Sequence, residues 1–186
     1  MSTDWFELLN TETPAHLGPD RRAGTWSESE ILARLVSLEE AEPAARRRSV
    51  VIRALVLLWH DHWNAAHELV QSDPSADAAL VHAIVHRREP DPWNSKYWWR
   101  RTGAHPALER LGREAGAVLE RHGTAGWARR LLPGGRWDPY AFVDLCTELQ
   151  GREESAEGQA ARALQRAEFE AVLATFVGGA GSGRQG

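Results

Sequence analysis

The apolar residues of this chain recur at three- and four-residue intervals, the spacing of amphipathic helices, and no stretch of useful length alternates as a β-strand does. The first apolar stripe follows a Ser27–Glu30 capping box. No helix-breaking residue separates Pro43 from Asp73, so residues 43–72 are expected to form one long helix or two nearly continuous ones.

Cap and turn residues divide the rest of the chain into further helices. They are expected at about 76–89, 93–102, 106–121, 124–132, 139–150 and 155–177. The pattern predicts an all-α fold, an irregular single-domain bundle of about seven helices with a central antiparallel helix hairpin around Asp73–Pro74. The domain is expected to span residues 1–177, and the glycine-rich residues 178–186 are expected to form a disordered tail.

Composition bounds the class of protein. A length of 186 residues fits one domain with one core. A hydrophobic share of 42% and a charged share of 26% are typical of globular chains and exclude a disordered or fibrous class. The longest apolar run, at 54–59, is far too short to cross a bilayer, and no signal-peptide pattern is visible, so no membrane partner is expected. The single cysteine, Cys146, indicates a reducing compartment, and a cytoplasmic location is expected.

Net charge and tryptophan content indicate which class of molecule the chain binds. The net charge of -4 disfavours nucleic acid. Nine tryptophans are present, and five of them fall between Trp59 and Trp99. This concentration is typical of aromatic walls around a small-molecule ligand, although a tryptophan-rich core would give the same pattern. Nothing in the sequence assigns an oligomeric state.

A polar stripe is expected within WHDHWNAAHELVQ, residues 59–71, at the 100° per residue of an α-helix. The residues on that face, about 60° wide, are His60, Asn64, His67 and Gln71. Two carboxylates, those of Asp61 and Glu68, flank the face. The block therefore predicts a ribbon of polar side chains along one side of the helix.

The next helix carries a second polar stripe. His82 and His86 are one turn apart, and Glu89 follows about one turn later. Because a short turn joins this helix to the previous one, the two helices are expected to pack antiparallel, with His67 level with His82 and His60 level with His86 to Glu89. The histidines of both stripes should therefore meet.

Imidazoles that converge from two helices suit two kinds of chemistry. They can bind a divalent metal ion such as zinc, iron or manganese, with nearby carboxylates orienting the rings. They can also transfer protons without a metal, because histidine titrates near neutral pH. A purely structural polar network is the third interpretation. The candidate metal ligands are His60, His67, His82 and His86, and the candidate catalytic residues are His67, His86, Asp61, Glu68 and Glu89.

Residues 86–106 carry the densest mixture of polar and aromatic side chains in the chain. Arg101 lies on the same helical face as Tyr97 and Asn94, so its guanidinium could clamp a carboxylate or phosphate against an aromatic wall. An arginine–carboxylate network that fixes this corner is the structural alternative. The candidate substrate-binding residues are Gln71, Asn94, Tyr97, Trp98, Arg101 and His105.

Two blocks of the chain, WHDHWNAAHELVQ and HAIVHRREPDPWNSKYWWRRTGAHP, resemble those of a family of small hypothetical proteins from bacteria and fungi. The resemblance covers residues 59–106 and implies a shared site, without implying a reaction. His60–Asp61 is similar to the histidine–aspartate pair of HD-type phosphohydrolases, but the separate upstream histidine and downstream aspartate of such a metal site are not identifiable. The glutamates of a di-iron ExxH bundle are missing as well.

The sequence therefore predicts a small helical enzyme, a hydrolase or a lyase, that acts on a compact, polar, anionic metabolite through His-based acid/base or metal-assisted chemistry. In this hypothesis His67 and His86 transfer protons or bind the metal, and Arg101 holds the substrate anion. The alternative is a non-catalytic small-ligand-binding or scaffold protein in which the same residues form a recognition pocket or a structural polar network.

Overall fold

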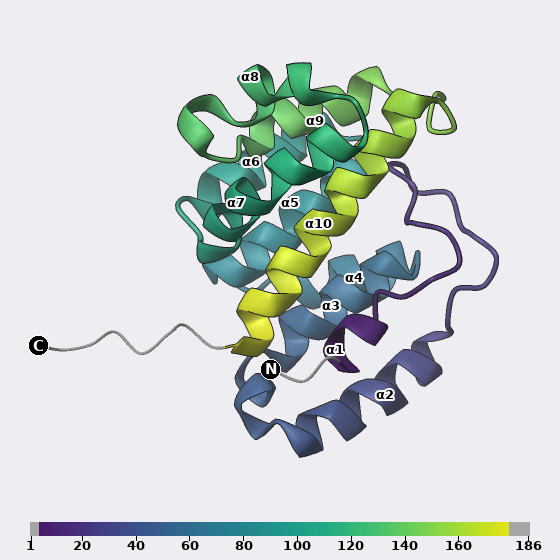
Figure 1. Cartoon of the computed structure of the whole chain (residues 1–186). Helices are drawn as coiled ribbons and strands as arrows, with labels where there is room; N and C mark the ends of the chain where they lie inside the picture. Colours follow the sequence, from purple (N-terminus) through teal and green to yellow (C-terminus); the bar gives the residue numbers. More distant parts are fainter. Residues whose placement is uncertain (1–3, 179–186) are drawn as a thin grey trace, which may run out of the picture.

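A computed structural model describes residues 4–178 of the chain (Figure 1). These residues form helices and loops without a strand, so the fold is all-α, as expected. The α-helices are α1 (Asp4–Glu7), α2 (Glu28–Ala41), α3 (Ser49–Trp59), α4 (Trp63–Val70), α5 (Ala76–Arg88), α6 (Pro92–Thr102), α7 (Pro106–Arg121), α8 (Ala128–Leu131), α9 (Pro139–Glu148) and α10 (Ala156–Gly178). Three short 3-10 helices span Pro43–Arg48, Ala125–Trp127 and Pro133–Gly135.

The described residues contain ten α-helices rather than about seven, because the segment 43–72 is divided and short helices occupy several connections. α4 and α5 form the expected helix hairpin around Asp73–Pro74. Apart from Gly178, which ends α10, the expected tail at 178–186 lies outside the described residues. No helix within this described range is both long and apolar enough to cross a membrane.

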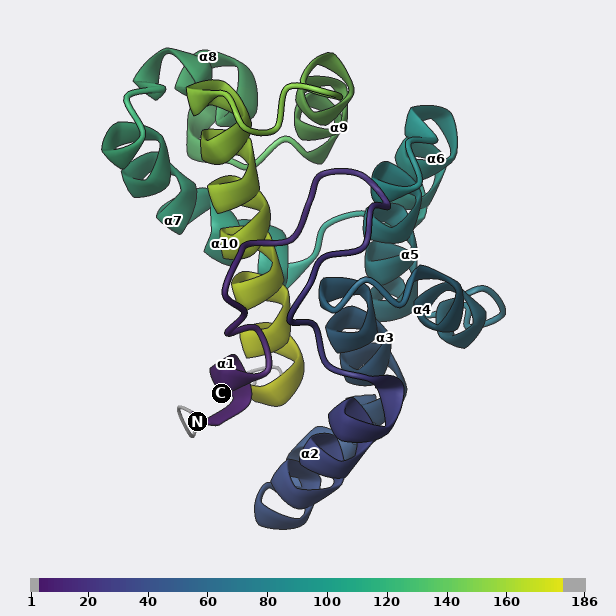
Figure 2. The ribbon, with the colours of Figure 1, turned by 90° about the vertical axis from the view of Figure 1, so that its right-hand side faces the viewer.

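The long helix α10 joins the two halves of the core. It packs along α7 and also contacts α3 (Figures 1 and 2). One cluster of buried apolar side chains surrounds α3 and α5, and a second surrounds α7 and α9. Phe169 and Phe176 of α10 belong to the first cluster, and Leu164 and Ala171 belong to the second. Both clusters are therefore parts of one domain.

The segment between α1 and α2 crosses one face of the molecule, over the junction of α10 with α3 and α5 (Figure 2). Two side chains of α10 hold it in place. Arg162 Nη2 donates to the carbonyl of Pro14 at 2.8 Å, and Gln165 Nε2 donates to the carbonyls of Ala15 and His16 at 3.0 and 2.9 Å. This irregular segment is thus anchored at residues 14–16, and its later residue Arg22 reaches the break between α3 and α4.

The single long helix considered for 43–72 is interrupted at residues 60–62. α3 ends at Trp59 and α4 starts at Trp63. Between them Asp61 adopts the left-handed backbone conformation, with φ of 66°. A residue in this conformation cannot continue a right-handed helix. The axis of α4 is therefore set independently of α3.

The carboxylate of Asp61 is buried and bonded to two arginines from distant segments. Its Oδ2 accepts hydrogen bonds from Arg22 N at 3.0 Å and Arg22 Nε at 2.9 Å, and its Oδ1 accepts one from Arg88 Nη2 at 2.8 Å. Burial alone would raise the pKa of Asp61, but the hydrogen bonds from Arg22 and Arg88 outweigh it and lower the pKa. The charged carboxylate therefore ties the N-terminal segment to the end of α5.

His60, the C-cap residue of α3, is fully buried and bonded through both ring nitrogens. Nδ1 accepts a hydrogen bond from the Trp26 backbone N–H at 3.1 Å, and Nε2 donates one to the Leu8 carbonyl at 2.9 Å. The Trp26 ring stacks on the imidazole, with the ring centroids 4.6 Å apart. Burial, together with the positive charge of Arg22, lowers the pKa of His60 to about 4, so its ring is neutral at neutral pH.

We expect Asp61→Asn to lower the free energy of unfolding by about 3–5 kcal/mol, because it leaves two buried guanidinium groups without their counter-charge. Asparagine tolerates the left-handed conformation, so backbone strain would not account for the loss. Urea denaturation measures the change. The control Glu68→Gln, which removes an exposed charge from α4, should stay within about 0.5 kcal/mol of the parent. A loss below about 1 kcal/mol for Asp61→Asn would contradict the assigned role of the network.

The lowered pKa of His60 should make the stability depend on pH. In the folded chain the ring stays neutral down to about pH 4, whereas in the unfolded chain it binds a proton near pH 6.5. Between these values the unfolded state binds more protons, so the free energy of unfolding falls as the pH falls. From about pH 7 to about pH 5, His60 should account for a loss of about 2 kcal/mol.

Denaturant unfolding of the parent, His60→Gln and His122→Gln at both pH values tests this expectation. His122 is exposed, so its variant should follow the parent. His60→Gln should lose about 2 kcal/mol less than the parent over the same interval. Equal losses in all three proteins would show that His60 is not the group that titrates.

Candidate metal centre

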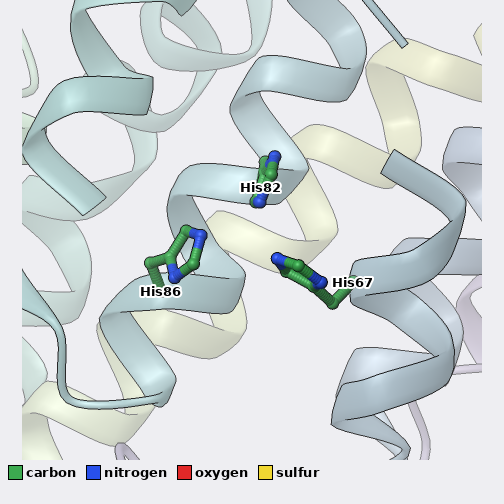
Figure 3. Close-up of side chains that lie close together, drawn as sticks. All are labelled: His67, His82 and His86. Carbon is green, nitrogen blue, oxygen red and sulfur yellow. The ribbon is translucent and has the colours of Figure 1, made fainter. Parts of the chain in front are cut away.

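Three imidazoles meet in the space between α4 and α5. His67 comes from α4, and His82 and His86 come from consecutive turns of α5 (Figure 3). The ring centroids are 4.7 Å apart for His67 and His82, 5.3 Å for His67 and His86, and 4.7 Å for His82 and His86. One nitrogen from each ring can be chosen so that all three lie within 4.8 Å of one another. Figure 3 shows each ring turning a nitrogen toward this shared space.

Two tryptophans hold the rings in position. Trp63 stacks on His67, with centroids 5.2 Å apart, and Trp98 stacks on His82, with centroids 4.0 Å apart. The indole Nε1 of Trp63 donates to the carbonyl of Val85 at 3.0 Å, which fixes α4 against α5. The cluster therefore has aromatic walls on two sides, supplied by α4 and α6.

His82 is the unusual member of the cluster. Its side chain is buried, with only 3% of the residue exposed, and neither ring nitrogen has a hydrogen-bond partner among residues 4–178. A buried polar atom without a partner costs about 1–3 kcal/mol, and such atoms often mark the place of an ion or a water. Burial, reinforced by the neighbouring His86 and His67, lowers the pKa of His82 to about 3. The ring is therefore neutral, with one free lone pair.

His86 is held by a carboxylate. Its Nδ1 lies 2.6 Å from Glu89 Oε2, and the side-chain nitrogen of Asn94 lies 3.1 Å from its Nε2. A carboxylate on Nδ1 favours the tautomer that carries its proton there, which leaves the lone pair on Nε2. Asp91 joins Glu89 and His86 in a second group of potential ligand atoms within 4.8 Å of one another. Asp91 also caps α6 by accepting from Asn94 N at 3.0 Å.

The cluster opens into a cavity of about 470 Å³. Its lining residues are Trp63, His67, Gln71, His82, His86, Glu89, Asp91, Asn94, Tyr97 and Trp98. Burial, together with the charge of His86, lowers the pKa of His67, so this ring also favours its neutral form. A small ligand entering the cavity would therefore meet the neutral rings of His67 and His82 and the carboxylates of Glu89 and Asp91.

Two predicted members of the site, His60 and Asp61, lie elsewhere. The break at Asp61 separates His60 from the face that carries His67, and both of its nitrogens are used by Trp26 and Leu8. Asp61 bonds to Arg22 and Arg88 instead of orienting an imidazole. Both corrections have one cause, because the continuous helix assumed for residues 59–71 does not form.

Three further predicted residues lie outside the cavity lining. Glu68 is exposed on α4. His105 caps α7, accepting from Ala107 N at 3.2 Å, and its Nε2 lies 2.8 Å from Asp77 Oδ1. Arg101 is exposed at the edge of the cavity, with its guanidinium carbon 5.4 Å from the centroid of the Trp98 ring. Arg101 therefore lies close to two lining residues, Tyr97 and Trp98, and Glu68 acts on the cavity only through its charge near His67.

The predicted site omitted two lining residues, Trp63 and Asp91. Each had a signal in the sequence. Trp63 lies one turn before His67, where stacking on the imidazole is the natural contact. Asp91 precedes Pro92 at the start of α6, an N-cap pattern that places its carboxylate beside Asn94. Local helix rules would therefore have placed both residues at the cavity.

The arrangement combines three imidazoles around one space, a carboxylate on the outer nitrogen of His86, and an open side toward the cavity. These are the parts of a metal centre in which the protein supplies three ligands and leaves a position free. Comparison of the chain with family models, with curated proteins and with solved structures finds no match in any of the three.

Proposed function

We propose that His67, His82 and His86 bind a divalent transition-metal ion and that the chain is a metal-dependent hydrolase or lyase acting on a small, polar, anionic molecule. The observation that carries the proposal is the state of His82, a buried ring without a hydrogen-bond partner for either nitrogen among the described residues. It faces two further imidazoles at 4.7 Å between ring centroids. A metal ion in the shared space would supply the missing partner.

The donor set favours zinc. Three neutral imidazole nitrogens are the ligands of several catalytic zinc sites, which keep the fourth position for water or substrate. Zinc held in this way lowers the pKa of a bound water to about 7 and polarises oxygen atoms of a substrate. The lowered pKa values of His67 and His82 help, because protons then compete less with the metal for the ring nitrogens.

Glu89 acts on His86 in this proposal. Its carboxylate holds the Nδ1 proton, so that Nε2 presents its lone pair to the metal. The side-chain nitrogen of Asn94, 3.1 Å from Nε2, competes for the same lone pair and would have to yield it. Asn94 is thereby freed to bond a substrate atom in the cavity.

Acid/base chemistry without a metal is the second candidate, and the short His86–Glu89 contact of 2.6 Å favours it. A histidine paired with a carboxylate is a common proton-transfer unit. This reading gives no role to His82, however, since a metal-free proton relay through His86 and Glu89 leaves both nitrogens of His82 without partners. The metal-dependent proposal accounts for all three rings.

Zinc content tests the proposal directly. Protein purified without an affinity tag, stripped with a chelator and reloaded with zinc should hold about one equivalent by elemental analysis. His82→Phe, which keeps a ring between Trp98 and His86 but removes both nitrogens, should hold less than about 0.2 equivalents. His122→Gln serves as the control and should keep about one. Reloading should also raise the melting temperature of the parent and not that of His82→Phe.

A parent protein that holds less than about 0.2 equivalents of zinc, cobalt or manganese would refute the metal centre, because a built site of this kind binds tightly. Retention of a full equivalent by His82→Phe would refute the assigned ligands instead. The two results are separable, since one concerns the metal and the other concerns the ring that binds it.

Substitution of Glu89 tests how the site is oriented. Glu89→Gln should weaken zinc binding by about 10- to 100-fold, because it removes the carboxylate that fixes the tautomer of His86. Competition with a chromogenic chelator measures the affinity. Glu68→Gln removes a carboxylate from the exposed side of α4, with no bond to a ligand, and should change the affinity by less than about threefold. Equal effects of the two substitutions would indicate a general charge effect rather than a role for Glu89.

A further inference from the structure

An exposed stripe of aromatic and basic side chains runs along α6 beside the candidate centre. It consists of Trp93, Tyr97, Arg100 and Arg101. The last three follow Trp93 by four, seven and eight positions, so all four share one side of the helix. Trp93 is 75% exposed and Tyr97 is 38% exposed, unusual values for such large rings. Tyr97 also lines the cavity, so the stripe begins at the cavity wall.

The two guanidinium groups of the stripe have no carboxylate partner among the described residues. Arg100 lies 5.9 Å and Arg101 lies 6.0 Å from the centroid of the Tyr97 ring, and Arg101 also reaches the Trp98 ring. The other cation of α6, Lys96, is paired with Asp144. The positive charge that remains free on this helix is therefore concentrated beside the cavity.

The charges inside the cavity have the opposite sign. Glu89 and Asp91 line it, and without a cation beside them they would repel an anion. The metal ion proposed for the three histidines supplies positive charge at the floor, and Arg101 supplies it at the rim. An anionic group is consequently attracted to the side of the cavity between these two cations.

The exposed rings add a second requirement. The Trp93 ring is largely exposed and the Tyr97 ring is partly exposed. Stacking of a planar ligand ring on such aromatic side chains is worth about 1–3 kcal/mol. Guanidinium groups beside aromatic rings also stack well on planar ligands. A cavity of about 470 Å³ accommodates a ligand of the size of a mononucleotide.

We propose that the stripe of Trp93, Tyr97, Arg100 and Arg101 binds the substrate of the metal centre, and that this substrate is an anion carrying a planar ring. This inference rests on the proposed function, because the anion is placed between Arg101 and the metal. A phosphate ester of a nucleoside and an aromatic carboxylate share the required chemistry. The ring stacks on Trp93 and Tyr97, and the anionic group enters the cavity.

Calorimetric titration of the zinc-loaded protein with two matched pairs of ligands tests the inference. The first pair is adenosine monophosphate and ribose phosphate, and the second is naphthoate and cyclohexanecarboxylate. In at least one pair the planar ligand should bind about tenfold more tightly than its ring-free partner. The pair that shows the preference identifies the anionic group.

Variants of the stripe separate its parts. Trp93→Ala should lose about tenfold in affinity for the planar ligand, while Trp93→Phe, which keeps an aromatic ring, should lose less than about threefold. Arg101→Gln should weaken both members of the preferred pair by about tenfold, because it removes a charge-assisted contact. Arg113→Gln, an exposed arginine of α7, is the control and should have no effect.

Failure of the inference is distinct from failure of the metal centre. If zinc binds at about one equivalent but neither planar ligand is preferred, the ligand class is overturned and the metal centre stands. The opposite result is also possible. If the protein does not retain zinc after loading, the metal centre fails. If that protein still prefers planar anions and Trp93→Ala abolishes the preference, the ligand class is supported. An unchanged affinity in Trp93→Ala overturns the stripe as the binding surface in either case.

Discussion

The geometry of the candidate centre depends on one buried carboxylate, that of Asp61. It bonds to Arg22 from the N-terminal segment and to Arg88 from the end of α5. Burying this charge is costly, and only two guanidinium groups with well-placed hydrogen bonds make it tolerable. Asp61 itself adopts the left-handed backbone conformation between α3 and α4, so α4 takes its own direction. That direction places His67 against His82 and His86.

The same network links the fold to the chemistry along α5. Arg88 lies between His86, whose ring belongs to the cluster, and Glu89, whose carboxylate holds that ring. The guanidinium of Arg88 therefore fixes the last turn of α5, next to Glu89, whose carboxylate orients His86. Arg87, on the other side of the helix, pairs with Glu168 of α10 and fastens α5 to the core. The end of α5 is thus held from two sides by buried charges.

Much of the fold follows from local rules, and the site follows only in part. The Ser27 capping box, the Ser75 cap and the start of α7 at Pro106 were each predictable from neighbours in the sequence. The break at Asp61 was not, because its partner Arg22 lies 39 residues earlier and no local signal announces it. Helical periodicity applied to residues 59–71 consequently put His60 on the same predicted helix face as His67. The i, i+4 pair of His82 and His86 needed no such distant contact and was placed correctly.

His82 differs from the other buried histidines of this fold in its hydrogen bonding. His60 is as deeply buried, and both of its nitrogens are bonded, one to Trp26 and the other to Leu8. His105 is likewise buried, and its nitrogens meet Ala107 and Asp77. Structural histidines in this chain are therefore satisfied by their neighbours. His82 has two rings stacked beside it and no partner for either nitrogen among the described residues. An apolar ring would pack there at lower cost, so packing alone does not explain a histidine at this position.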